Sequence, residues 1–180
     1  MTYYGATEIA RSFRTVRNNT IKIAEEIPEE KYGFRPCEGC RSVAETLVHI
    51  ALIPRIQEQI QFTERRSTLV GFDFFASMGK VIGDEKTPRS KAQIIDLLRT
   101  EGDRFATLLE GATEPFLAEQ VQYPEGMEPR FKSRFEMLIA PKEHEMHHRA
   151  QLMTIQRLLG QKTHLTRQME ERIAAMQAGR

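Results

Sequence analysis

Apolar residues recur every three or four positions along most of the chain, which is the period of a helix with one buried face. The pattern predicts a first helix over about residues 7–26, and we expect its arginines, Arg17 among them, to form a solvated face. Pro28 ends this helix, because the residue before a proline is driven out of the α region. The inward positions are Ile9, Phe13, Val16, Ile23 and Ile27.

Three capping boxes mark the starts of three further helices. In each box the serine side chain accepts a hydrogen bond from the amide three residues on, and the side chain of that residue accepts one from the serine amide. The pairs are Ser42 with Glu45, Ser90 with Gln93, and Ser133 with Glu136. The chain therefore has the helix count of a four-helix bundle.

Two of these helices contain a proline, and a final helix follows them. Pro54 and Pro141 each remove a helical hydrogen bond, so we expect both helices to bend there. The helix between them runs to Glu110, and Gly111 is expected to end it in the left-handed conformation. Residues 163–177 form an amphipathic helix that we expect to pack on the bundle or on a second subunit.

Two segments have no clear period. Residues 71–83 are rich in aromatic side chains and predict a mixed loop or short helix that could cover an opening or a partner subunit. Residues 112–132 contain three prolines and predict a long loop that could overlie a pocket. With 180 residues, the chain is expected to be a single all-α domain, with a core over about residues 6–160.

Charge and composition exclude some classes of protein. Lys and Arg number 26 against 25 Asp and Glu, a net charge of +1 with no basic block, which argues against a surface for nucleic acid. No apolar run reaches the roughly 18 residues of a membrane span, and the N-terminus has no signal-peptide pattern. We expect a soluble, cytoplasmic protein that binds neither nucleic acid nor membrane.

The two cysteines, Cys37 and Cys40, are too few for a disulfide framework. A Cys-x-x-Cys pair can be half of a zinc site or a redox pair. Because no second pair exists to complete a four-sulfur site, we expect two reduced thiols in a loop.

Three of the five histidines lie in the last long helix. His144 and His148 are four residues apart, about 40° on the helical wheel, on the face that the following apolar residues bury. This spacing lets two imidazoles bind one metal ion. His147 lies at the edge of the same face, as a neighbour of the pair, whereas His164 is exposed by its pattern and has no expected role. The alternative is a pair of buried histidines satisfied by hydrogen bonds alone.

A further histidine, His49, lies in the second helix. Alone it is more commonly structural, but with His144 and His148 it becomes the natural third ligand, because a bundle core brings facing helices together. Glu45, one turn before His49, and Glu145, beside His144, are candidates to hold a ligand in place or to act as a base. More commonly, such glutamates are a helix cap and a solvated charge.

The chain resembles the DinB/YfiT-like metal-binding four-helix bundles. The resemblance is carried by Arg35-Pro36, by residues 41–49, and by the His-x-x-x-His-Arg-x-Gln-Leu pattern of residues 144–152. It implies an up-down-down-up bundle, a three-histidine site for a divalent metal, and frequent homodimers. His49, His144 and His148 correspond to the family's ligands. The neighbouring polar positions are Arg149 and Gln151.

The functional prediction combines this resemblance with the histidines. Family members of known activity are transferases and isomerases that use low-molecular-weight thiols. Three imidazoles leave open positions on a zinc, nickel or iron ion, which could activate a bound thiol or water. The leading hypothesis is therefore a metal-dependent enzyme, a thiol transferase or hydrolase acting on a small electrophile. The alternatives are a non-catalytic metal- or small-molecule-binding stress-response protein, and a helical dimer with structural histidines.

Overall fold

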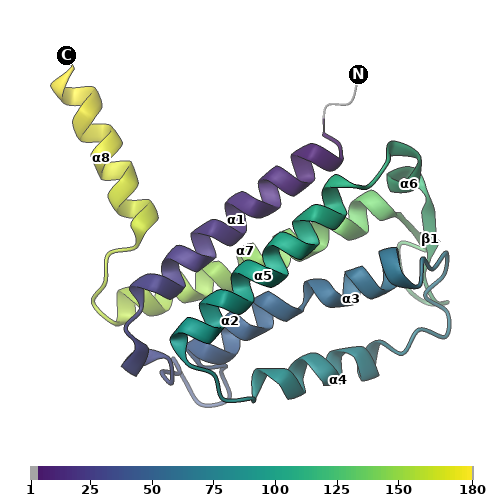
Figure 1. Cartoon of the computed structure of the whole chain (residues 1–180), viewed down its shortest axis with the longest axis horizontal. Helices are drawn as coiled ribbons and strands as arrows, with labels where there is room; N and C mark the ends of the chain where they lie inside the picture. Colours follow the sequence, from purple (N-terminus) through teal and green to yellow (C-terminus); the bar gives the residue numbers. More distant parts are fainter. Residues whose placement is uncertain (1–3, 180) are drawn as a thin grey trace.

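The computed structural model describes residues 4–179 and is mostly helical (Figure 1). Four long helical segments form the bundle, and one of them is divided into α2, α3 and a short π-helical turn, η2. A 3₁₀ turn, η1 (Glu29–Lys31), follows the first helix. The bundle segments are α1 (Ala6–Glu26), α2 (Val43–Leu52) with α3 (Pro54–Glu58) and η2 (Gln59–Thr63), α5 (Lys91–Glu110) and α7 (Arg134–Leu158).

The order of directions is up-down-down-up, as the family resemblance implied. In Figure 1, α1 and α7 run one way, whereas α2–α3 and α5 run the other. The parallel pair needs a crossover, which α4 (Phe74–Glu85) supplies by returning the chain along α2 and α3. The expectation of a mixed loop or short helix for residues 71–83 thus resolves into a three-turn helix beside the bundle.

All three predicted capping boxes are present, with Ser42, Ser90 and Ser133 as the N-caps. The expected left-handed conformation of Gly111 is wrong, because its φ of −77° lies in the right-handed region. The chain continues directly into α6 (Glu114–Ala118), whose N-cap is Thr113, so α5 ends without a left-handed residue at Gly111.

The two prolines behave differently. Pro54 divides its helix: α2 ends at Leu52 and α3 begins at Pro54 itself. Pro141 lies inside α7, which continues through it to Leu158.

Residues 112–132, predicted as one long loop, contain regular structure at the end of the bundle. After α6, β1 (Gln120–Gln122) pairs antiparallel with β2 (Phe131–Ser133). The centre of the register places Val121 opposite Lys132, and Val121 is fully buried. Gln122 of β1 also bonds the loop after η2 at Ser67 and Leu69, β2 leads directly into α7, and Val121 belongs to the larger core cluster.

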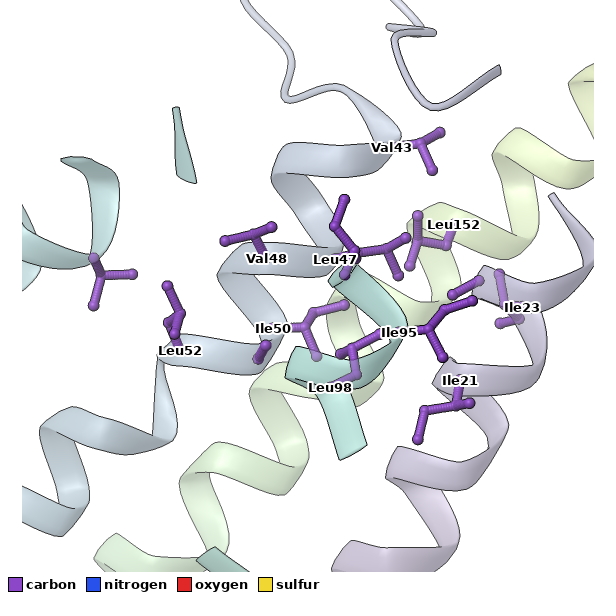
Figure 2. Close-up of a cluster of buried hydrophobic side chains, with 14 of the residues drawn as sticks. Ile21, Ile23, Val43, Leu47, Val48, Ile50, Leu52, Ile95, Leu98 and Leu152 are labelled. Atoms are coloured by element: carbon purple, nitrogen blue, oxygen red, sulfur yellow. The ribbon is translucent and has the colours of Figure 1, made fainter. Parts of the chain in front are cut away.

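The apolar core follows the predicted inward faces. Its larger cluster joins α1, α2, α5 and α7, and Figure 2 shows Ile23, Leu47, Ile50, Leu98 and Leu152 converging. A second cluster at the other end of α1 includes Phe13 and Phe105, whose rings meet edge to face at 5.2 Å between centroids. Each such side chain contributes about 1.5–3 kcal/mol on burial, so the bundle is a stiff frame for the polar groups within it.

The last helix, α8 (His164–Ala178), projects away from the bundle (Figure 1). His164 is buried and its Nε2 lies 3.1 Å from Asn19 Oδ1, so the expectation that it is exposed is wrong. The turn at Gly160, with φ of 76°, brings the start of α8 back against α1. Beyond that first turn the helix does not pack on the bundle as expected. Its exposed apolar side chains are Met169, Ile173 and Met176.

Within the described part of the chain, the helices are too short or too polar to cross a bilayer.

Candidate metal centre

Three histidines from two helices meet inside the bundle. His49 comes from α2, and His144 and His148 from α7, and one nitrogen of each lies within 4.8 Å of the others. The Nε2 of His144 is 3.1 Å from that of His49 and 3.2 Å from that of His148. His49 and His148 are buried and His144 is half-buried. The structure thus brings the three predicted ligands together.

These separations suit a common cation. Imidazole nitrogens bind zinc at about 2.0–2.1 Å, so two of them in a tetrahedral site lie roughly 3.3 Å apart. The two short separations in this cluster, 3.1 and 3.2 Å, are close to that value. The donor set, three imidazoles, also suits nickel and iron.

A carboxylate from α4 orients His49. Glu85 is buried, and its Oε1 lies 2.6 Å from His49 Nδ1, while its Oε2 accepts from Arg41 Nε at 2.7 Å. Since a carboxylate only accepts, the His49 proton is on Nδ1 and the lone pair of Nε2 faces the other two histidines. An acceptor on the far nitrogen is the usual arrangement for a metal-binding histidine.

The Gln151 side chain orients His148 in the same way. His148 Nδ1 donates to Gln151 Oε1 at 2.8 Å, which leaves the lone pair of Nε2 turned inward. The amide of Gln151 then donates to His147 Nε2 at 3.1 Å. Gln151 therefore lies beside the site as the resemblance implied, and His147 is an exposed neighbour of the pair.

Hydrogen bonds among the three imidazoles cannot satisfy all of their ring nitrogens. His49 and His148 both present a lone pair to His144 Nε2, which carries at most one proton and can donate to one of them. The Nδ1 of His144 is buried and has no hydrogen-bond partner within residues 4–179. A cation at the centre accepts all three lone pairs, so the geometry favours metal binding over a purely structural role.

The pKa values point to neutral imidazoles. Burial lowers the pKa of His49 and of His148, and for His144 burial and then the neighbouring histidines lower it to about 3. The side chains are therefore uncharged at neutral pH, which is the state that binds metal.

The two glutamates proposed from the sequence have other roles. Glu45 caps α2 and pairs with Arg35, whose hydrogen bond is the main reason that the pKa of Glu45 falls to about 2. The expectation that Glu45 is a helix cap is therefore confirmed. Glu145 is fully buried on another side of α7 and binds Arg17, so the expectation of a solvated charge is wrong for this residue. The role expected for Arg149 beside the site stays a prediction.

Sequence reasoning missed Glu85. It stands between Asp84 and Lys86, which look like the polar end of a helix, and it lies just beyond residues 71–83, whose pattern predicts a mixed loop or short helix. The available signal was the spacing Ser77, Val81, Glu85, which places the three buried residues of α4 on one face.

Two openings flank the histidines. A cleft of about 680 Å³ reaches His148 and Gln151, and its other wall is the loop that includes Arg35, Cys40 and Arg41. A smaller hollow of about 180 Å³ reaches His144 on the other side. Its lining is largely apolar and includes Ile53, Ile56, Phe74, Met78 and Pro141. The cluster is thus accessible from a polar side and from an apolar side.

Comparison with known proteins gives one family and one fold. The model of the DinB superfamily matches residues 12–152. The chain is 24% identical over 159 residues to the uncharacterized protein YjoA of Bacillus subtilis (strain 168), covering 86% of this chain and 91% of that one.

The solved structures agree in fold. The crystal structure of YjoA aligns with a TM-score of 0.63 at 21% identity, over 86% of this chain and 94% of that one. YfiT from Bacillus subtilis, described as a probable metal-dependent hydrolase with an unusual four-helix bundle topology, aligns with a TM-score of 0.68 at 14% identity, over 90% and 91%. A putative DinB-family member from Exiguobacterium sibiricum 255-15 gives 0.62 at 22% identity, over 89% and 94%.

Proposed function

The chain belongs to the DinB superfamily, and on that premise we propose that it is a metal-dependent enzyme that activates a low-molecular-weight thiol or water for attack on a small electrophile. The observation that carries the proposal is the convergence of three Nε2 atoms, two of them with lone pairs fixed inward by Glu85 and Gln151. A site designed only for structure would pair donors with acceptors instead.

The residues of this chain divide the work. His49, His144 and His148 would hold a divalent cation, and three protein ligands leave positions open to other molecules. A zinc, nickel or iron ion bound there lowers the pKa of a coordinated thiol or water. Glu85 accepts a hydrogen bond from His49 Nδ1 and is itself held by Arg41, so the imidazole keeps its direction.

The two openings support a reaction of two molecules. The cleft beside His148 is lined by charged and hydroxyl side chains, among them Lys86, Thr46 and Thr154, and suits a polar nucleophile such as a thiol cofactor. The hollow beside His144 is lined mainly by apolar groups and suits the carbon skeleton of an electrophile. The description of YfiT as a probable metal-dependent hydrolase supports water as the other nucleophile.

The first test is the metal content of protein purified without a histidine tag. We expect about one equivalent of zinc, nickel or iron per chain, and loss of that metal in His148→Ala. The matched control is His147→Ala, since His147 is an exposed histidine on the same helix outside the cluster. Wild-type protein without metal after reconstitution, or equal metal in wild type and His148→Ala, would contradict the proposal.

The second test is turnover with thiols and electrophiles. Metal-dependent turnover that disappears with chelation and in His148→Ala supports an enzyme. Saturable binding of a small molecule without turnover would instead support the alternative, a non-catalytic metal- and small-molecule-binding stress-response protein.

Two further parts of the proposal concern assembly and location. We propose a homodimer in which the exposed apolar face of α8, including Met169 and Ile173, packs on a second copy. We also propose that the protein acts in the cytoplasm. Light scattering on the full chain tests the dimer, and a monomeric mass at micromolar concentration would contradict it.

A further inference from the structure

The two cysteines form a tight turn at the end of the loop between η1 and α2. The Cys40 amide donates to the Cys37 carbonyl at 3.3 Å, and Gly39 between them has φ of 78°, a value that suits glycine. This geometry brings the two Sγ atoms to 2.6 Å from each other. Both thiols are free, Cys37 is exposed and Cys40 is half-buried, so small molecules can reach the pair.

This turn is part of the wall of the cleft that reaches the histidines. Cys40 and Gly39 line the cleft together with His148 and Gln151. The Cys40 carbonyl accepts from Arg35 Nη1 at 2.6 Å. The next residue along the chain, Arg41, binds Glu85, so the turn is tied to both sides of the cleft mouth.

From this juxtaposition we propose that Cys37 and Cys40 are a reversible dithiol–disulfide pair that exchanges with low-molecular-weight disulfides entering the cleft. One cysteine thiolate attacks a sulfur of the small disulfide, forming a mixed disulfide and releasing one small thiolate. The other cysteine then attacks the protein sulfur of that mixed disulfide, closing the Cys37–Cys40 bond and releasing the second. Two cysteine thiols are oxidised and one small disulfide is reduced to two thiols.

The inference does not rest on the histidine site. The only group of potential metal ligands found among residues 4–179 is the three histidines, so the cysteines are not assigned to a zinc site. The hydrogen bond with Cys40 raises the pKa of Cys37, so Cys37 keeps its proton at neutral pH. Exchange should therefore speed up as the pH rises.

The experiment incubates the full-length, reduced protein with oxidised glutathione. The chain has two cysteines, so thiol titration and intact mass report on this pair alone. We expect wild-type protein to lose both thiols and the mass of two hydrogen atoms, and dithiothreitol to restore both. The reaction should be faster at about pH 9 than at about pH 7.

Single-cysteine variants provide the matched controls. Cys37→Ser and Cys40→Ser should each retain glutathione as a stable mixed disulfide, because no second thiol displaces it. Wild-type protein treated with a chelator and dialysed should be oxidised like untreated protein, which separates this inference from the metal site. The inference is overturned if the wild type keeps both thiols, if it holds a stable glutathione adduct, or if non-reducing electrophoresis shows disulfides between chains.

Discussion

Two buried polar clusters lie side by side on α7, and they are built on opposite principles. His144 belongs to the histidine cluster, whereas its neighbour Glu145 belongs to an ion pair with Arg17 of α1. Both clusters lie within the same apolar frame. In the ion pair, a guanidinium meets a carboxylate of opposite charge. In the histidine cluster, three imidazole nitrogens point at one another.

Every side-chain nitrogen of Arg17 and both oxygens of Glu145 have a hydrogen-bond partner. Arg17 Nε donates to both oxygens of Glu145 at 3.0 and 3.1 Å, and Nη2 donates to one of them at 2.9 Å. Nη1 donates to the carbonyl of Leu98 in α5 at 2.8 Å, and Nη2 also donates to that of Ile50 in α2 at 3.1 Å. One guanidinium thus joins four helices of the bundle.

The contrast shows how to separate a structural polar cluster from a binding site. The donors of Arg17 meet acceptors, so nothing further is required. The histidine cluster has three nitrogens directed at one point, which favours a shared cation there. The ion pair also holds the residues next to two of the ligands, Ile50 beside His49 and Glu145 beside His144.

The largest expected effect comes from breaking the ion pair. Glu145→Ala leaves Arg17 buried and unpaired, and should lower the free energy of unfolding of the metal-free protein by about 3–5 kcal/mol in urea denaturation. Arg17→Met combined with Glu145→Leu should recover most of this loss, because two buried apolar side chains need no partner of opposite charge. A loss below about 1 kcal/mol in Glu145→Ala would mean that the pair is hydrated like a surface bridge.

The second effect tests how closely Arg17 is packed. A Cβ at Gly102 of α5 would lie 2.8 Å from Arg17 Cγ, so Gly102→Ala should cost about 1–3 kcal/mol by urea denaturation. Gly111→Ala is the control, because Gly111 has a right-handed conformation and ordinary contacts of 3.7 Å or more. If Gly102→Ala were as stable as wild type, the guanidinium would not be fixed as described.

A third prediction concerns the orientation of His49. Glu85→Gln keeps an acceptor near Nδ1 but removes its charge, and should weaken metal affinity by about 10–100-fold in competition with a chelator. Glu45→Gln is the matched control, since Glu45 lines the same cleft but binds Arg35 and Ser42. Equal loss in both variants would show a general charge effect of the cleft rather than orientation of the ligand.

A fourth prediction is a pH dependence specific to the histidines. Below pH 6.5 the unfolded chain takes up protons on its histidines, whereas the folded cluster resists protonation because burial lowers its pKa values, to about 3 for His144. The free energy of unfolding of the metal-free protein should therefore fall as the pH drops from 6.5 towards 3. His144→Leu should make this slope shallower, and an unchanged slope would contradict the assigned cause.

The sequence predicted the histidine cluster better than the ion pair. The spacing of His144 and His148 places them on one face, and the bundle brings His49 to them, so local patterns sufficed. The charge of Arg17 predicts a solvated position like those of the other arginines of its helix, although Arg17 lies one turn from Phe13 and one turn from Ile21 on the buried side. The helical periodicity thus indicates a buried position for Arg17, whereas the charge of its side chain favours an exposed one.

Other parts of the structure depend on contacts that local patterns do not specify. Glu85 reaches His49 only because α4 returns along α2, and this crossover comes from the topology of the whole chain. His164 is buried because the turn at Gly160 brings it to Asn19, far away in the sequence. Residues 112–132 are rich in turn-forming residues, and the two strands of their hairpin, three residues each, are too short to give a clear sequence pattern.

The central claim is that the three Nε2 atoms share one cation, and X-ray absorption at the metal edge tests it most directly. With zinc-loaded, untagged protein, we predict three imidazole nitrogens at about 2.0–2.1 Å, with oxygen or nitrogen rather than sulfur in the remaining positions. Spectra dominated by sulfur, which would place the metal at Cys37 and Cys40, or spectra without imidazole scattering would contradict the account.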